Sequence, residues 1–189
     1  MADIFLECDS CNGKRFKEKI LEVKIKGKNI YDVLDMTIED SLKFFENSKT
    51  IINKLRPLND VGLGYLKLGQ SSSTLSGGEA QRLKLASYLI QDNKVSKNNS
   101  LFIFDEPTSG LHNMDIENFM KSVNDLIARD NSVIIIEHNT ELIKQADWII
   151  DMGPGGGENG GTICFEGEPT ELVNTNNNKT GKYLRKMFV

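Results

Sequence analysis

One group of residues that could handle phosphate lies at the start of a helical pattern. Ser76 is followed three positions later by Glu79, the spacing of a capping box at a helix N-terminus. Gly77 and Gly78 fall in the first turn, where each costs roughly 1 kcal/mol of helix stability relative to alanine. Bare N–H groups at the positive end of a helix can approach an anion closely. The pattern therefore predicts a phosphate contact, although an ordinary capped helix would use the same cap.

A second group follows two apolar runs, 101–104 and 133–136. Short, wholly apolar runs are typical of strands buried on both faces of a parallel sheet, which binds ligands at its carboxyl edge. Asp105 and Glu106 follow the first run, and His138 follows the second. Asp105 could hold Mg²⁺, Glu106 could polarise an attacking water and His138 could bond to a terminal phosphate. The alternative is that the acids are solvated loop residues and that the histidine is incidental.

The loop that would hold a nucleotide's phosphates is missing from the sequence. No stretch matches G-x-x-x-x-G-K-[ST]. The stretch 155–160 formally fits G-x-G-x-x-G, but a strand pattern follows it instead of a helix, so we interpret it as a glycine-rich hairpin. The chain thus offers part of a nucleotide site, and we expect the rest to precede Met1 in a longer parent chain.

Cys8 and Cys11 form a C-x-x-C pair followed by Asn12 and Gly13, a tight turn typical of a zinc knuckle. A structural zinc site needs four protein ligands, and Cys164 lies in an apolar stretch where a buried hydrophobic role is expected. Two interpretations stay open. Either the pair is half of a zinc module whose other ligands lie upstream, or it is a pair of free thiols.

The 189 residues are 39% hydrophobic and carry a net charge of −4, which excludes a uniformly basic nucleic-acid coat. The one strongly basic stretch, 14–28, serves either solubility or phosphate contact. Within it, alternating apolar and polar residues over 21–26 predict a strand with one wet face. No apolar run is long enough for a bilayer span and no secretory signal is present, so we expect a cytoplasmic protein without a membrane partner.

The remaining patterns predict an α/β fold. Thr37 begins a helical hairpin that continues to Pro57. A short extended piece and a turn over 61–69 lead to Ser76, and a helix is predicted from about Asn113 to Arg129. The last predicted elements are a short helix over 139–145, strands over 148–152 and 161–165, a short helix over 169–173 and a terminal helix over 183–189.

Three motifs in order, L-S-G-G-E-A-Q-R, F-I-F-D-E-P-T-S-G-L-H and I-I-E-H, resemble the signature, Walker B, D-loop and switch histidine of the ABC ATPase superfamily. The S-G-L-H turn, the glycine-rich hairpin and the segment beginning C-D-S-C-N-G-K-R-F narrow the match. Together they resemble the C-terminal part of the UvrA family, the damage-recognition subunits of bacterial nucleotide excision repair.

This resemblance implies a partial ABC-type ATPase core, with a parallel sheet flanked by helices. It divides the chain into a remnant of a zinc-binding, DNA-contacting module (1–28), a helical signature subdomain (29–98) and the C-terminal part of the second module's ATPase core (99–189). Zn²⁺ would be held by Cys8 and Cys11 together with an upstream pair.

The resemblance also assigns roles to the phosphate-handling residues. Glu106 and His138 would be catalytic, and Asp105 would serve ATP and Mg²⁺ in the same module. The signature residues would contact a nucleotide held by the other module; they are Ser76, Gly77, Gly78 and Glu79. The implied partners are damaged double-stranded DNA, UvrB-like subunits of the excision-repair complex and a second copy of the full-length protein.

Two other functions remain open at this point. One is the ATP-binding subunit of an ABC transporter, which would carry no C-x-x-C before the signature. The other is a non-catalytic module that donates a signature to a partner. We expect ATPase activity in the full-length parent and none in the isolated chain, because both phosphate-holding loops are missing from it.

Overall fold

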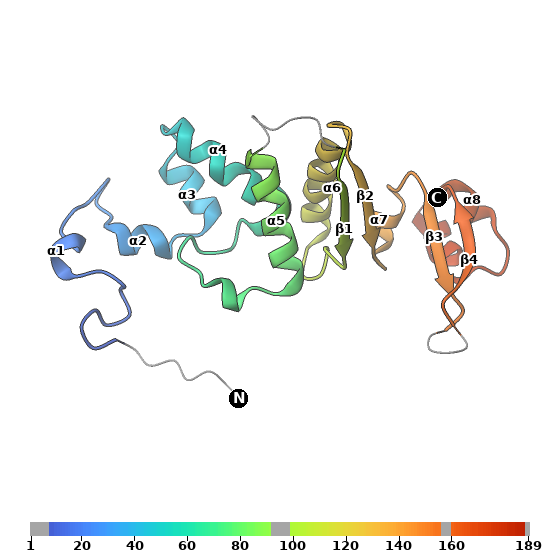
Figure 1. The fold of residues 1–189 in the computed structure, drawn as a ribbon, viewed down its shortest axis with the longest axis horizontal. Helices are drawn as coiled ribbons and strands as arrows, with labels where there is room; N and C mark the ends of the chain where they lie inside the picture. The colour runs from blue at the N-terminus through green and yellow to red at the C-terminus, as the bar shows by residue number, and fades with distance from the viewer. Residues whose placement is uncertain (1–7, 92–98, 156–159, 188–189) are drawn as a thin grey trace. The chain divides into compact units, whose positions relative to one another are not determined.

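The computed structural model describes residues 8–91, 99–155 and 160–187. The chain divides into two compact units, Met1–Ser96 and Lys97–Val189 (Figure 1). The first unit is helical, and the second contains both sheets. None of the helices within the described ranges is long and apolar enough to cross a membrane.

The first unit is a series of short helices that ends in one long helix. The elements are α1 (Glu18–Leu21), α2 (Ile30–Asp35), α3 (Ile38–Phe44), α4 (Lys49–Leu58), the π-helix η1 (Asn59–Leu63), the 3-10 helix η2 (Ser72–Thr74) and α5 (Gly77–Gln91). The backbone N–H of Asp40 donates to Thr37 Oγ1 at 3.0 Å, which caps α3. The predicted helical hairpin is therefore confirmed as α3 and α4.

The core of this unit forms where α4, η1 and α5 meet, and most of its buried residues are aliphatic. These are Ile38, Leu55, Val61, Leu63, Leu66, Leu85 and Ala86. The segment after η1 runs beside the α2–α3 connection, with Ile38 N–H donating to the Leu66 carbonyl and Leu68 N–H to that of Met36. These bonds fix the segment that leads to the signature.

Two local predictions in this unit differ from the structure, and one helix was not predicted. The alternating stretch 21–26 forms no strand. Helix α1 ends at Leu21, and among the described residues Ile25 pairs only with Lys28, across a turn, so no neighbouring strand there completes a ladder. The stretch 61–69 is not extended at its start, because it contains the end of η1, where the chain bends at Gly62 with a left-handed, non-helical φ of 77°. Helix α2 was not predicted, although Asn29 and Asp32 form a reciprocal capping box.

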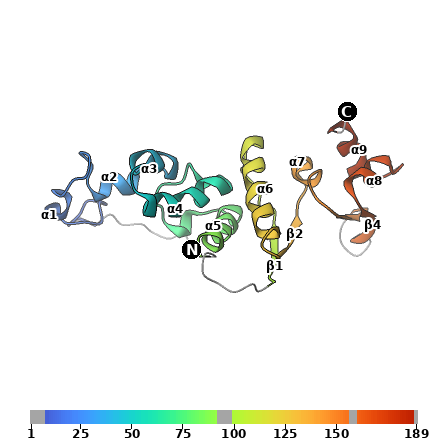
Figure 2. The same cartoon turned by 90° about the horizontal axis from the view of Figure 1, so that it is seen from above.

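The second unit contains a parallel pair of strands, β1 (Leu101–Asp105) and β2 (Ser132–Ile136), joined by α6 (Asn113–Ile127). Leu101 lies opposite Ser132 and Asp105 opposite Ile136, so both strands end at the same edge. Figure 1 shows α6 beside the two strands, and Figure 2 shows the same elements from above. Phe119 of α6 packs edge-on against Phe104 at 5.9 Å between ring centroids. The predicted strands, their parallel pairing and the helix between them are confirmed.

Only one face of this sheet is covered within the described residues. Phe104 is 5% exposed, whereas the side chains on the other face are between 50% and 62% exposed. The exposed side chains are Leu101, Ile103, Ile134 and Ile136. The prediction that both faces of these strands are buried was therefore wrong for this chain, because α6 covers one face only.

A second, antiparallel pair completes the unit: β3 (Ile149–Gly153) and β4 (Thr162–Gly167). It follows the short helix α7 (Thr140–Ile143) and precedes α8 (Pro169–Asn174), α9 (Lys179–Leu184) and the 3-10 helix η4 (Arg185–Met187). The core of this part of the chain, from β3 to α9, is formed by Ile149, Leu172 and Leu184.

Two predictions about this region were wrong. Cys164 is exposed, because its side chain does not face that core. The last helix begins at Lys179 instead of 183, since the Asn178 side chain caps it by accepting from Gly181 N–H at 2.8 Å. The predicted hairpin tip at 156–159 lies outside the described residues.

Candidate functional site

The N-terminus of α5 carries the capping box that the sequence predicted. The Ser76 N–H donates to Glu79 Oε2 at 2.6 Å, and the Glu79 N–H donates back to Ser76 Oγ at 3.3 Å. Gly77 is exposed, and a Cβ added there would meet nothing within 4 Å. Side chains on either side therefore hold the first turn, and the backbone at Gly77 is open to an approaching anion, whereas Gly78 is buried.

A tyrosine from the preceding segment fixes the glutamate of this box. Tyr65 donates its hydroxyl to Glu79 Oε1, and the positive charge of the fully buried Arg82 also acts on this pair. The hydrogen bond from Tyr65 is the largest cause that holds the pKa of Glu79 below its ordinary value, followed by that from the Ser76 N–H. The glutamate is therefore kept ionised as the acceptor that orders the helix start.

At the end of β1, Asp105 and Glu106 stand next to each other, and both are exposed. Glu106 has φ 48°, in the left-handed region that side chains other than glycine and asparagine seldom adopt. Its N–H donates to the Ile136 carbonyl at 2.9 Å, so the strained residue is tied to the end of β2. Strain of this kind persists only where the surroundings impose it, and it is common at functional sites.

His138 lies beside Glu106 across the sheet edge. Its Nδ1 is 3.7 Å from Glu106 Oε1, and the two side chains are 83% and 61% exposed. The structure thus brings together Asp105, Glu106 and His138 from two strand ends, as the parallel pairing requires. Their exposed groups are available to a ligand from outside the chain.

Glu137 organises this edge, a role that the sequence alone did not indicate. Its Oε1 accepts from the N–H and the hydroxyl of Thr108, and its Oε2 accepts from the N–H groups of His138 and Asn139. Burial opposes ionisation of Glu137, but these hydrogen bonds, led by that from the Thr108 hydroxyl, hold its pKa below the ordinary value. One carboxylate therefore joins the loop after β1 to the loop after β2.

Cys8 and Cys11 lie in a tight turn in which the Cys11 N–H donates to the Cys8 carbonyl at 3.2 Å and the Asn12 N–H at 2.8 Å. Hydrogen bonds from Ser10 and Cys11 lower the pKa of Cys8. Among the described residues, no group of three or more potential ligands could hold a metal. The pair fits half of a tetrahedral zinc site and does not complete one.

The predicted residues therefore form three local groups, which are the cysteine turn and the signature helix in the first unit and the acidic sheet edge in the second. The chain thus offers an open glycine backbone at a helix start and two adjacent carboxylates, which are groups of the kinds that bind phosphate and Mg²⁺. The one sequence feature that could have indicated the role of Glu137 is its position directly before His138 at a strand end. Its partner Thr108, however, is distant in sequence.

No family model matches the chain. UvrABC system protein A of Mycoplasmopsis pulmonis is 49% identical over 188 residues, covering 100% of this chain and 20% of that protein. The protein of the same name from Clostridium perfringens is 52% identical over 186 residues, covering 98% and 20%. The crystal structure of UvrA2 from Deinococcus radiodurans superposes with a TM-score of 0.78 at 40% identity, covering 95% of this chain and 22% of that one.

These relatives match the chain along nearly its whole length, although it spans only about one fifth of theirs. The match includes the parallel sheet and the helices described above. The chain therefore belongs to the UvrA family.

Proposed function

We propose that this chain is the C-terminal part of a DNA-damage-recognising ABC ATPase of nucleotide excision repair. The observation that carries the proposal is the sheet edge, where Glu106 is held at a positive φ beside His138. Both residues lie at the carboxyl ends of parallel strands, where open α/β sheets bind ligands. The names of the relatives support the excision-repair assignment over the transporter alternative.

Each side chain at the sheet edge has a different role in hydrolysis. Glu106 orients and polarises the attacking water, and His138 donates a hydrogen bond to the terminal phosphate. Asp105 would hold Mg²⁺, which would supply positive charge to neutralise the phosphates. Glu137 positions both loops by accepting from Thr108 on one side and from His138 on the other.

The signature helix serves a different nucleotide from the one at the sheet edge. Ser76, Gly77 and Gly78 contact the terminal phosphate of a nucleotide held by another ABC module, and Glu79 fixes the geometry of that turn. ATP binding thus requires parts of the full-length protein beyond this chain. Hydrolysis in that protein is coupled to binding damaged double-stranded DNA, with a second copy of the protein and UvrB-like subunits as partners.

The catalytic assignment is tested in a full-length chimera, in which this chain replaces the aligned segment of the Clostridium perfringens relative. Glu106→Gln keeps the size of the side chain and removes the general base, so we expect ATP turnover to fall by a factor on the order of 100 to 10,000. Nucleotide binding should persist, as measured with a fluorescent ATP analogue. The control is Glu117→Gln, an exposed change on α6. Unchanged turnover in the Glu106 variant would remove the role given to this residue.

We also propose that Cys8 and Cys11 are the second half of a zinc module in the full-length protein. The isolated 189-residue chain should then contain less than one zinc per chain by metal analysis, and both thiols should alkylate readily. Cys8 should react faster than Cys164, because its lowered pKa gives more thiolate at neutral pH. Stoichiometric zinc with protected thiols in the isolated chain would instead mean that two chains share a site.

A further inference from the structure

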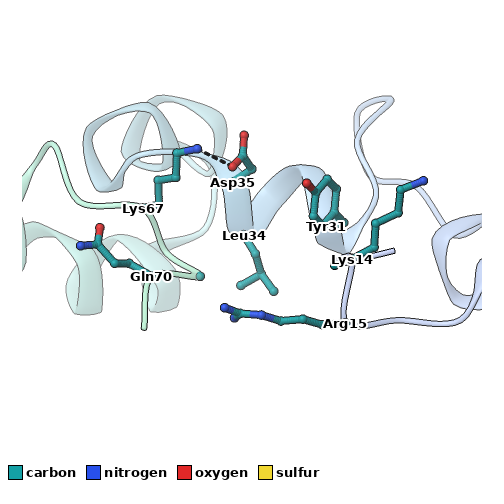
Figure 3. A pocket seen from close by; sticks show the side chains of 9 residues that line it. Lys14, Arg15, Tyr31, Leu34, Asp35, Lys67 and Gln70 are labelled. Atoms are coloured by element: carbon teal, nitrogen blue, oxygen red, sulfur yellow. Dashed lines mark hydrogen bonds and ion pairs between the residues drawn. The ribbon is translucent and has the colours of Figure 1, made fainter. Parts of the chain in front are cut away.

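A cavity of about 290 Å³ lies in the first unit, on the side of α2 that faces the residues after the cysteine turn (Figure 3). Arg15, Tyr31, Leu34, Lys67 and Gln70 are among the residues that line it. Its size is at the lower end of the range found for small-ligand sites. The roles proposed above for the signature and the sheet edge use none of these side chains.

The charges around the cavity are unequal. Lys67 Nζ lies 2.6 Å from Asp35 Oδ1, so the one carboxylate in the lining is already paired. Lys14 and Arg15 form no ion pair with any other described residue, and both are exposed. Arg15 therefore brings a positive charge to the cavity that no carboxylate of the lining balances, and Lys14 adds a second at the rim, which favours an anion.

The lining also includes one apolar and one aromatic side chain, Leu34 and Tyr31. In Figure 3 the Arg15 guanidinium extends beneath Leu34, Tyr31 stands on the same helix, and the Lys14 ammonium points away from them. Gly69 closes one side: its N–H donates to the Leu34 carbonyl at 2.8 Å, and a Cβ there would lie 3.0 Å from that oxygen. Gln70 follows at the rim, with its amide pointing away from Leu34 and Arg15 (Figure 3).

We propose that this pocket holds one nucleotide unit of a nucleic-acid strand, with a backbone phosphate on Arg15 and the sugar or base against Leu34 and Tyr31. A guanidinium binds phosphate oxygens in a planar fork, and aromatic side chains provide a surface on which bases stack. Lys14 strengthens the field at the rim. The assignment rests on the proposed function, in which the full-length protein binds DNA, and it identifies which basic residues make the contact.

The test is fluorescence anisotropy of a labelled DNA duplex titrated with the full-length chimera and its variants at several salt concentrations. Arg15→Gln should weaken binding about three- to tenfold and reduce the slope of log affinity against log salt by about 1. Tyr31→Ala should weaken binding with little change in slope. Lys24→Gln, an exposed change in the same basic stretch but outside the cavity, is the matched control. Arg15 and Tyr31 are exposed, and circular dichroism of each variant confirms that it folds.

The outcomes separate the pocket from general electrostatics. Equal losses of DNA affinity for Arg15→Gln and Lys24→Gln, or no loss for Arg15→Gln, would overturn the proposal.

Mononucleotide and inorganic phosphate are added as competitors. Displacement of DNA by either at micromolar concentration would identify the pocket as a site for free phosphate and overturn the assignment to a strand. ATP turnover is measured in the same samples. If the chimera hydrolyses ATP and binds DNA, and Arg15→Gln does not change its DNA affinity, only the pocket proposal is refuted. If the unmutated chimera neither hydrolyses ATP nor binds DNA, the proposed function is refuted.

Discussion

The signature turn and the sheet edge both present groups to phosphate, but they are ordered in opposite ways. At the signature, the groups offered are backbone N–H groups, and side chains close in sequence fix them: Ser76 and Glu79 cap each other, and Tyr65 holds Glu79. At the sheet edge the groups offered are side chains, and the backbone beneath them is fixed by Glu137, 29 residues from its partner Thr108.

This difference predicts how each site responds to change. A locally capped turn loses one or two hydrogen bonds when a cap residue is altered, whereas the sheet edge depends on one carboxylate with four donors. The signature should therefore tolerate single substitutions in its supporting residues better than the sheet edge does.

The largest effect on stability is expected for Glu137→Ala. The change leaves the donors of Thr108, His138 and Asn139 without their acceptor, and Thr108 is buried, so we expect a loss of about 2 kcal/mol. Amide hydrogen exchange should speed up at Thr108 and His138 together. Glu117→Ala on α6 is the control, and retained protection at either amide would mean that Glu137 does not join the loops.

Gly77→Ala probes the signature from the side of the backbone. The added Cβ has open space, and alanine favours a helix, so the chain should gain up to about 1 kcal/mol of stability, measured by thermal unfolding. ATP turnover of the full-length chimera should nevertheless fall, because the methyl group covers the N–H groups. Lys84→Ala in the same helix is the control. Unchanged turnover would mean that the glycine is not needed for phosphate approach.

Tyr65→Phe should have a smaller effect, about 0.5 kcal/mol, because the pair it forms with Glu79 is partly exposed. Without the hydroxyl, the pKa of Glu79 should rise toward its ordinary value, which NMR titration of the side chain would detect. Tyr183→Phe, far along the chain and 63% exposed, is the matched control. A loss as large as that of Glu137→Ala would remove the contrast between the two sites.

Acid should weaken both sites by a modest amount. The pKa values of Glu79 and Glu137 are lower in the folded chain than their ordinary value of 4.5. Their contributions are therefore complete above about pH 4.5 and are lost as the pH falls through the folded pKa. Amide exchange followed from about pH 6 down to about pH 3, corrected for intrinsic rates, should show loss of protection at Ser76 and at His138. Protection that rises as the pH falls in this range would contradict the direction of both shifts.

The same contrast explains what could be predicted from the sequence. The cap at Ser76 and the strands that end at Asp105 and Ile136 depend on local spacing, and they were predicted correctly. The reciprocal cap at Asn29 also depends on local spacing, yet α2 was not predicted. The role of Glu137 could not be predicted, because it depends on a partner brought close only by the pairing of β1 with β2.

The wrong strand at 21–26 has a related cause. Alternating apolar and polar residues give a strand one apolar and one polar face. Such a segment forms a strand only where a neighbouring strand provides hydrogen-bond partners. Val23 and Ile25 are 71% and 61% exposed, so their side chains are not buried against an apolar layer that would stabilise a strand.

The uncovered face of the β1–β2 sheet bears on how this chain behaves when it is made by itself. Ile134 and Ile136 belong to a run of β-branched residues with high strand propensity and no charge, and they lie exposed next to Leu101 and Ile103. An exposed apolar face of this kind can pack against copies of itself. The isolated chain should therefore bind chaperones during synthesis and self-associate as its concentration rises. A charged substitution such as Ile103→Lys should reduce this self-association of the isolated chain.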